Sequence, residues 1–248
     1  MNLWKYRLAQ LISSAQPPRH QVGRRVLMYH SIDPTNGAGH DIYTISKVKF
    51  AQHVQHLASK NDQQKPRVVP LASPEPEGVS ITFDDGYSDT LTVAAKLLCA
   101  TDLPFSVFVT AQNIISGDSK YLDKNQLIEL SQMPNVTIGS HGHSHLRLAD
   151  LSNEQIQKEL QQSKELLEDL TEKTIDTMSY PHGSYTAEVL KIAAELGYKF
   201  ATTSNWGVYN VGSNPLEIPR IDIWSYDDQT VLRQKLSGKW DWMKRFIR

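Results

Sequence analysis

The chain has 248 residues, a formal net charge of −1 at pH 7, 40% hydrophobic residues and a single cysteine. This length suits one well-buried α/β domain better than two. The near-neutral charge does not indicate nucleic acid as a partner, and one cysteine excludes an intramolecular disulfide. No apolar run approaches the roughly 18 residues that a membrane span needs.

Residues 1–23 are predicted to be an amphipathic N-terminal extension preceding a globular domain at 24–248. Within it, Trp4 and Leu8 are mixed with Lys5 and Arg7, so the uninterrupted apolar core of a secretory signal is missing. Two interpretations stay open: a helix or frayed tail on the domain, or a weak peripheral contact with a membrane surface or a partner. By elimination, we expect a cytoplasmic protein.

Short apolar runs alternate with helical patterns along the rest of the chain. Strands are expected at Arg25–Tyr29, Val79–Phe83, Pro104–Val109, Val136–Ile138, Thr177–Tyr180, Phe200–Thr203 and Ile218–Ile223. Helices are expected at Ser46–Lys60, Ser88–Ala100, Leu122–Ser131, Ser152–Leu170, Ala187–Leu196 and Asp228–Leu236.

Start signals support three of these helices. Ser46 and Asp123 stand at expected N-caps, and Ser152 with Gln155 has the spacing of a capping box. On the first of these helices, His53 and His56 are expected to be solvated.

Strands that alternate with helices indicate a parallel sheet, and about seven or eight such units predict a closed or nearly closed α/β barrel. Active sites of barrels lie at the carboxyl ends of the strands. His30, Asp84, Asp85, His141 and the Pro181 loop all follow predicted strands, so we expect them to meet at one end.

The adjacent carboxylates of Asp84 and Asp85 follow a buried strand and precede Gly86. Buried carboxylates are costly unless a positive group neutralises them. Where the strand ends, the backbone can curve so that both side chains reach one site. One carboxylate would then bind a metal and the other would accept a proton from the attacking water.

The second cluster is Ser140-His141-Gly142-His143-Ser144-His145. Its glycine argues against a continuous helix, but a turn after a strand can direct His141 and His145 to one point, with His143 facing elsewhere. An Asp/His/His set with open positions suits zinc or another borderline divalent ion.

These segments resemble the signatures of the NodB-like polysaccharide deacetylases, carbohydrate esterase family 4. The first signature is Thr82–Gly86, the second is Ser140–His145, and the third is Ser179-Tyr180-Pro181-His182-Gly183. The likeness covers roughly residues 24–225 and is closest to the branch acting on poly-N-acetylglucosamine.

The resemblance implies a distorted (β/α)7 barrel with a single catalytic domain. It implies that Asp84 is the general base and that Asp85, His141 and His145 hold the metal. The implied reaction removes an N-acetyl group from a sugar and releases acetate. Metal-bound water attacks the carbonyl, and the backbone N–H of His182 helps to stabilise the oxyanion.

This chain departs from the family's pattern at two groups around the expected base. The family's third signature has an arginine two residues before its proline, where this chain has Ser179. We expect Arg220, from a later strand, to tether the base, the alternative being an ordinary ion pair. The family's late histidine is also missing, and His30 in an early Tyr-His motif is expected to act as the general acid.

Aromatic walls suit the apolar face of a sugar ring. Trp206 is the candidate from the fourth signature, with core packing as the alternative, and Tyr87 and Trp224 are weaker ones. Pro181 and His182 are expected to contact substrate through the third signature.

The sequence therefore predicts a metal-dependent hydrolase of an N-acetylated saccharide, with Zn²⁺ as the expected ion. Two alternatives remain. One is a deacetylase or deformylase of a sugar nucleotide, lipid-linked sugar or other small amide. The other is a barrel that binds sugar without catalysis.

Overall fold

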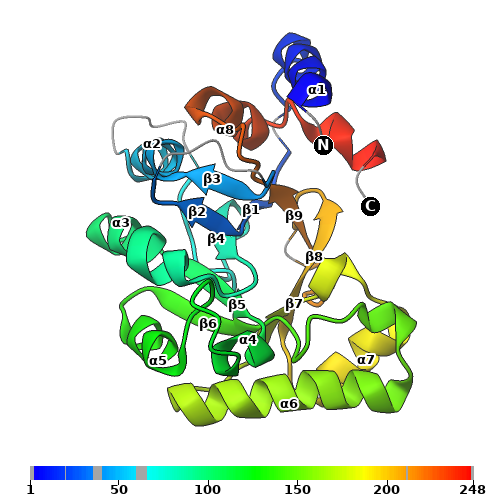
Figure 1. Cartoon of the computed structure of the whole chain (residues 1–248). Helices are drawn as coiled ribbons and strands as arrows, with labels where there is room; N and C mark the ends of the chain where they lie inside the picture. Colours follow the sequence, from blue (N-terminus) through cyan, green and yellow to red (C-terminus); the bar gives the residue numbers. More distant parts are fainter. Residues whose placement is uncertain (1–2, 20, 36–40, 60–65, 211, 247–248) are drawn as a thin grey trace.

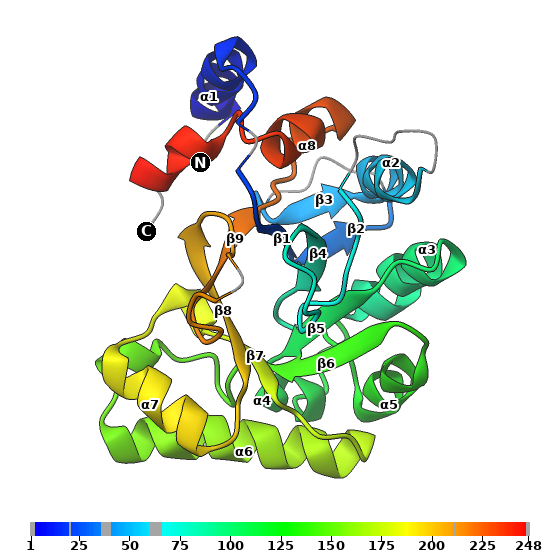
Figure 2. The same cartoon turned by 180° about the vertical axis from the view of Figure 1, so that it is seen from behind.

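The computed structural model describes residues 3–19, 21–35, 41–59, 66–210 and 212–246. Seven parallel strands form a closed barrel, and helices surround it (Figures 1 and 2). The barrel strands, in their order around it, are β1 (Arg24–Tyr29), β4 (Gly78–Phe83), β5 (Phe105–Val109), β6 (Val136–Ser140), β7 (Thr177–Ser179), β8 (Phe200–Trp206) and β9 (Ile218–Asp222).

The outer layer is helical. It comprises α2 (Lys47–Ala58), α3 (Lys96–Ala100), α4 (Ala111–Ile115), α5 (Lys124–Gln132), α6 (Asn153–Thr171), α7 (Ala187–Glu195) and α8 (Gln229–Leu236), with α1 (Leu3–Ala15) outside α8. Among the described residues, no helix has the length and apolar character to cross a membrane.

The barrel closes between its first and last strands, where Met28 of β1 pairs with Asp222 of β9. Tyr29 pairs with Phe83 on the other side of β1. Because all seven strands run parallel, their carboxyl ends share one rim, as predicted. The expected barrel is confirmed, with seven strands and full closure.

The predicted helix starts are also confirmed. Ser46 caps α2 through its side chain. Asp123 and Gln126 form a capping box on α5, and Ser152 and Gln155 form one on α6. These local signals can be read from sequence because each is complete within one turn of helix.

One predicted helix needs correction, and one small sheet was not predicted. The helix expected at Ser88–Ala100 is a π-helical turn at Thr90–Ala95 followed by the short α3. The small parallel sheet of β2 (Ser31–Asp33) and β3 (Thr44–Ser46) was not predicted. Three-residue strands contain too few side chains to show an alternating pattern.

The predictions that His53 and His56 are solvated are wrong, because both residues are buried. The side chain of His53 is fully buried, and its Nδ1 lies 3.0 Å from the Tyr29 hydroxyl. Burial lowers the pKa of His53 to about 4. The residue stands with Phe50, Val54 and Leu57 on the helix face that packs inward, which makes a neutral core histidine.

The N-terminal helix is docked on the domain next to α8 and the C-terminal segment (Figure 1). The Tyr6 hydroxyl donates to Asp227 Oδ1 at 2.9 Å. The indole Nε1 of Trp242 donates to Ser13 Oγ at the same distance. The inner face of the extension is therefore packed on the domain, as the first of the two interpretations expected.

A buried cation organises the core beneath this helix. Lys235 is fully buried, 2.5 Å from Asp227, and it lies 3.9 Å from the ring centre of Trp224. Trp206, 1% exposed, packs against Trp224 at 5.9 Å between ring centroids. Trp206 and Trp224 are thus core residues, as the open alternative for Trp206 had it, and the prediction of either as a wall for sugar is corrected.

Replacing Trp206 by alanine is expected to lower the free energy of unfolding by about 3–5 kcal/mol, because a large buried side chain leaves a cavity. Urea denaturation followed by circular dichroism measures this change. Trp4→Ala, at a side chain that is 61% exposed, serves as the control and should change stability by less than about 0.5 kcal/mol. Unchanged stability in the Trp206 variant would contradict the core assignment.

Candidate metal centre and its surroundings

The turn after β4 brings two consecutive carboxylates to the rim of the barrel. The backbone N–H of Asp84 donates to the carbonyl oxygen of Tyr29 at 3.0 Å, which continues the pairing with β1. Asp85 then adopts φ = 71° and Gly86 φ = 72°. This left-handed turn bends the chain, so that both aspartates face the same site, as the sequence predicted.

Asp84 is held by a buried arginine from β9. Nη1 and Nη2 of Arg220 each donate to one oxygen of Asp84 at 2.7 Å, and both side chains are almost fully buried. Arg220 Nη2 also donates to Ser179 Oγ at 2.9 Å, and Ser179 Oγ donates to Asp84 Oδ2 at 3.2 Å. The tether predicted from β9 is present in the structure.

Burial alone would raise the pKa of Asp84, but Arg220 and, secondarily, His141 outweigh it and lower this pKa below its usual value. The carboxylate is therefore ionised at neutral pH. Both of its oxygens are oriented by the guanidinium, which favours a fixed, charged acceptor over a metal ligand.

The three predicted metal ligands meet beside this pair. Nε2 of His145 lies 3.2 Å from Nε2 of His141 and 3.3 Å from Oδ1 of Asp85, and the third side of the triangle is 3.5 Å. A point equidistant from these three atoms lies about 1.9 Å from each, close to the roughly 2.0–2.2 Å of zinc–nitrogen and zinc–oxygen bonds. The donor set fits a divalent ion of this class.

The orientation of His141 supports this fit. Its Nδ1–H donates to the carbonyl oxygen of Ser179 at 2.8 Å, which leaves Nε2 unprotonated and facing the other two ligand atoms. Burial lowers the pKa of His141, although Asp84 and Asp85 oppose this change. Its side chain is 3% exposed and that of His145 is 33% exposed, so the centre opens to solvent beside His145.

The loop that carries both histidines is fixed from α6. Glu159 is mostly buried, and its Oε2 accepts the backbone N–H groups of His143 at 3.2 Å and Ser144 at 2.8 Å. Sequence reasoning missed Glu159, because a glutamate on a helix is ordinarily exposed to solvent. The available signal was its spacing, three residues after Ile156, which places it on the buried face of α6.

His30 follows β1 at the same rim. Its Nδ1 is buried without a hydrogen-bond partner among the described residues, and its ring lies 4.7 Å from that of Tyr43. It contributes to lowering the pKa of Asp84 and of Asp85, where burial is the largest, opposing effect. The structure therefore brings His30 within electrostatic reach of both carboxylates.

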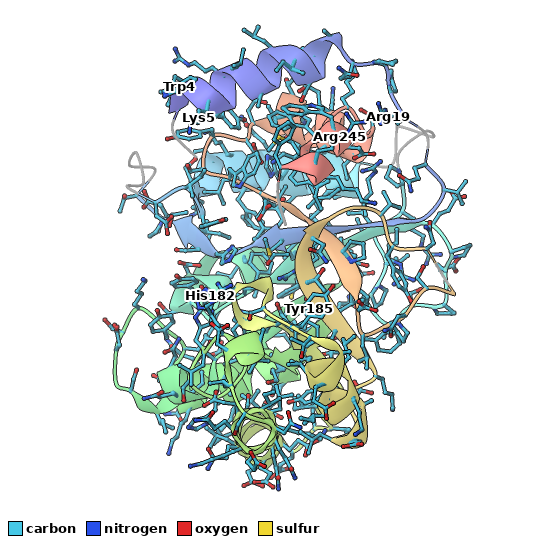
Figure 3. All side chains as sticks on the ribbon, turned by 90° about the vertical axis from the view of Figure 1, so that its right-hand side faces the viewer. Trp4, Lys5, Arg19, His182, Tyr185 and Arg245 are labelled. Carbon is cyan, nitrogen blue, oxygen red and sulfur yellow. The ribbon has the colours of Figure 1, made fainter. Side chains whose placement is uncertain are left out.

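The third signature lies next to the ligands. Pro181 begins a 3₁₀ turn, Pro181–Gly183, in which His182 has φ = 57°. The His182 ring is exposed and lies 4.4 Å from that of His145 (Figure 3). Tyr87 is mostly buried and stacks on Tyr121. Burial raises the pKa of Tyr87, and the charge of the nearby Asp85 raises it further.

The two aspartates are expected to differ in their effect on metal binding. Asp85→Asn should weaken the affinity for Zn²⁺ more than about 100-fold because it removes an anionic ligand, whereas Asp84→Asn should keep the ion. Elemental analysis and competition with a fluorescent zinc chelator measure both. His145→Ala removes a second candidate ligand. Its matched control is His143→Ala in the same loop, which should retain metal. Equal losses in both aspartate variants would contradict the division of roles.

Comparisons with known proteins indicate one family. A family model described as "Polysaccharide deacetylase" matches residues 72–201. The chain is 31% identical over 188 residues to the Bacillus subtilis (strain 168) protein YxkH, which carries a polysaccharide deacetylase name, and this match covers 73% of the chain. It is 25% identical over 142 residues to chitin deacetylase 1 of Cryptococcus neoformans, covering 57% of the chain. These matches span 64% and 28% of the two relatives' lengths.

Solved structures share the fold. The Streptococcus pyogenes deacetylase PplD in complex with acetate superposes with a TM-score of 0.75 at 26% identity, covering 89% of this chain and 99% of that one. IcaB from Ammonifex degensii gives 0.73 at 21% identity, covering 88% and 98%. With the family model matching more than half of the sequence, the chain belongs to the polysaccharide deacetylase family.

Proposed function

We propose that this protein is a metal-dependent hydrolase that removes the N-acetyl group from an N-acetylated sugar or polysaccharide and releases acetate. The observation that carries the proposal is the triangle of Asp85, His141 and His145 beside an aspartate that a buried arginine holds ionised. Family membership supports the same reaction class.

Asp85, His141 and His145 would hold the ion, and their mixture of one carboxylate and two imidazoles suits zinc or another borderline divalent metal. When bound, such an ion supplies a water of lowered pKa and a Lewis acid for the acetyl carbonyl. Asp84 is the proposed base. Its fixed, charged carboxylate accepts the proton that the attacking water loses.

His30 is the proposed general acid. As an imidazolium, it donates a proton to the amide nitrogen while the carbon–nitrogen bond breaks, so acetate and a free amine are the products. Two observations support this role: the buried Nδ1 of His30 has no hydrogen-bond partner among the residues that the structure describes, and the charge of His30 contributes to lowering the pKa of both aspartates.

The other proposed contacts with the substrate lie at the carboxyl ends of the barrel strands. The backbone N–H of His182, in the turn that Pro181 begins, is the proposed oxyanion donor beside the ion. Tyr87 is proposed to border the acetyl site beside Asp85. Because the exposed His145 side of the centre is open, the sugar is expected to approach from there.

A polymeric or oligomeric N-acetylated saccharide is the preferred substrate class. A sugar nucleotide, a lipid-linked sugar or another small amide would use the same centre and stays the alternative. The intact set of Asp84, Asp85, His141 and His145 disfavours a barrel that only binds sugar. A cytoplasmic location and the identity of the metal stay predictions.

The function is tested by acetate release from N-acetylglucosamine oligomers and polymer, measured with the zinc-loaded protein. Arg220→Ala should lower kcat at least about 100-fold, since the base loses its orientation. Arg147→Ala, at an exposed arginine on the same rim, is the matched control. Metal binding without turnover on any saccharide would contradict the proposal, and near-normal turnover in the Arg220 variant would contradict the role of the tether.

His30→Ala should lower the rate on N-acetylated sugars by about 100- to 10,000-fold while the protein retains its metal. The variant should keep most of its activity on 4-nitrophenyl acetate, because this leaving group departs without protonation. Rates on the two substrates, measured side by side, separate loss of an acid from general damage. A proportional loss on both would exclude the acid role.

A further inference from the structure

The outer face of α1 exposes large apolar side chains. Five of them lie on this helix, and two more lie in the adjoining segments: Leu3, Trp4, Leu8, Leu11, Ile12, Val22 and Phe246, which are 39–73% exposed. The face that α1 turns to the domain is smaller and more polar, with Tyr6, Ala9 and Ser13. A helix that only packed on a domain would have the opposite arrangement.

Helical geometry gathers the exposed residues into one stripe. Trp4, Leu8 and Leu11 are separated by four and three residues, so at about 100° per residue they lie on one face, opposite Tyr6. The same geometry places Lys5 and Arg7 on the two borders of this stripe. An apolar stripe between cations is typical of helices that lie in a membrane surface.

Basic residues are concentrated at the two ends of the chain. Residues 1–32 contain five basic and no acidic residues, and residues 233–248 contain six basic and one acidic residue. In a chain of net charge −1, the residues between them therefore carry −11. Arg24, Arg25 and Lys235 are buried and do not contribute to the surface. The helix α1 and the C-terminal turn Asp241–Arg245 lie side by side (Figures 1 and 2), so the exposed cations Lys5, Arg7, Lys244 and Arg245 share one side of the molecule.

We infer that this outer surface of α1, with Lys5 and Arg7 at its borders and Phe246 nearby, attaches the protein to an anionic lipid bilayer. The helix would lie in the interface, with its stripe among the headgroups and upper acyl chains. A second copy fits less well. A twofold contact would place each basic α1 against its own counterpart without acidic partners.

The direction of α1 relates this surface to the metal centre. In Figure 3, Trp4 and Lys5 at the start of the helix are labelled on the same side of the molecule as His182, and Arg19 on the other. A bilayer against α1 would therefore run past the open end of the barrel. The centre would stay accessible to saccharide beside the membrane.

The inference is tested by sedimentation of the full chain with vesicles. Binding is expected to mixed phosphatidylglycerol–phosphatidylcholine vesicles, to be weaker on phosphatidylcholine alone and to decrease with salt. Leu8→Ser/Leu11→Ser should lower the partition coefficient at least about tenfold. Lys5→Gln/Arg7→Gln should lower it about fivefold per charge, on the anionic vesicles only.

Val48→Ser/Ile115→Ser is the matched control, because these side chains are 52% and 50% exposed on other helices. It should bind like the unaltered protein. Circular dichroism verifies folding, and acetate release from a soluble substrate should be unchanged in every variant, so failure here is distinct from failure of the proposed function. Absent vesicle binding, or equal binding by the Leu8/Leu11 variant, would overturn the inference. A dimer in light scattering that this variant dissociates, without vesicle binding, would assign the surface to a second copy.

Discussion

The ion pair between Arg220 and Asp84 is the contact around which the barrel interior and the candidate site are built. Arg220 reaches from β9 across β1 to β4, and it also donates to the Thr203 carbonyl of β8 and to Ser179 of β7. Burying two charges is costly, and removing one partner of such a pair typically costs about 3–5 kcal/mol. The pair therefore requires a closed barrel, because its partners lie on strands that meet only after closure.

Ser179 connects this pair to the metal ligands. Its side chain bonds Asp84 and Arg220, while its carbonyl oxygen accepts from His141. The family's third signature has an arginine two residues before its proline. This chain has Ser179 at that position, and the guanidinium comes from Arg220 of β9 instead. In this chain, the buried positive charge beside Asp84 thus comes from another strand.

A second buried cation, Lys235, stabilises the core between the barrel and α1. Lys235 and Asp227 connect the aromatic core to Tyr6 of α1. The inner face of the N-terminal helix is thus integrated into the domain through a charged network. Its outer face stays apolar and basic, next to a domain with an excess of acidic residues. This division of charge gives the molecule two surfaces of different chemistry.

The sequence alone determined the order of the barrel strands, the capped helix starts and the candidate cluster of Asp85, His141 and His145, because these signals are short and local. For Arg220 it left a tether and an ordinary ion pair open, because the contact with Asp84 joins strands far apart in the chain. Only the tertiary structure decided that Trp206 and His53 are core residues and that Glu159 holds the histidine loop. These depend on which side chains meet across strands and helices distant in the chain. Burial is a property of the whole packed barrel, and no single segment encodes it.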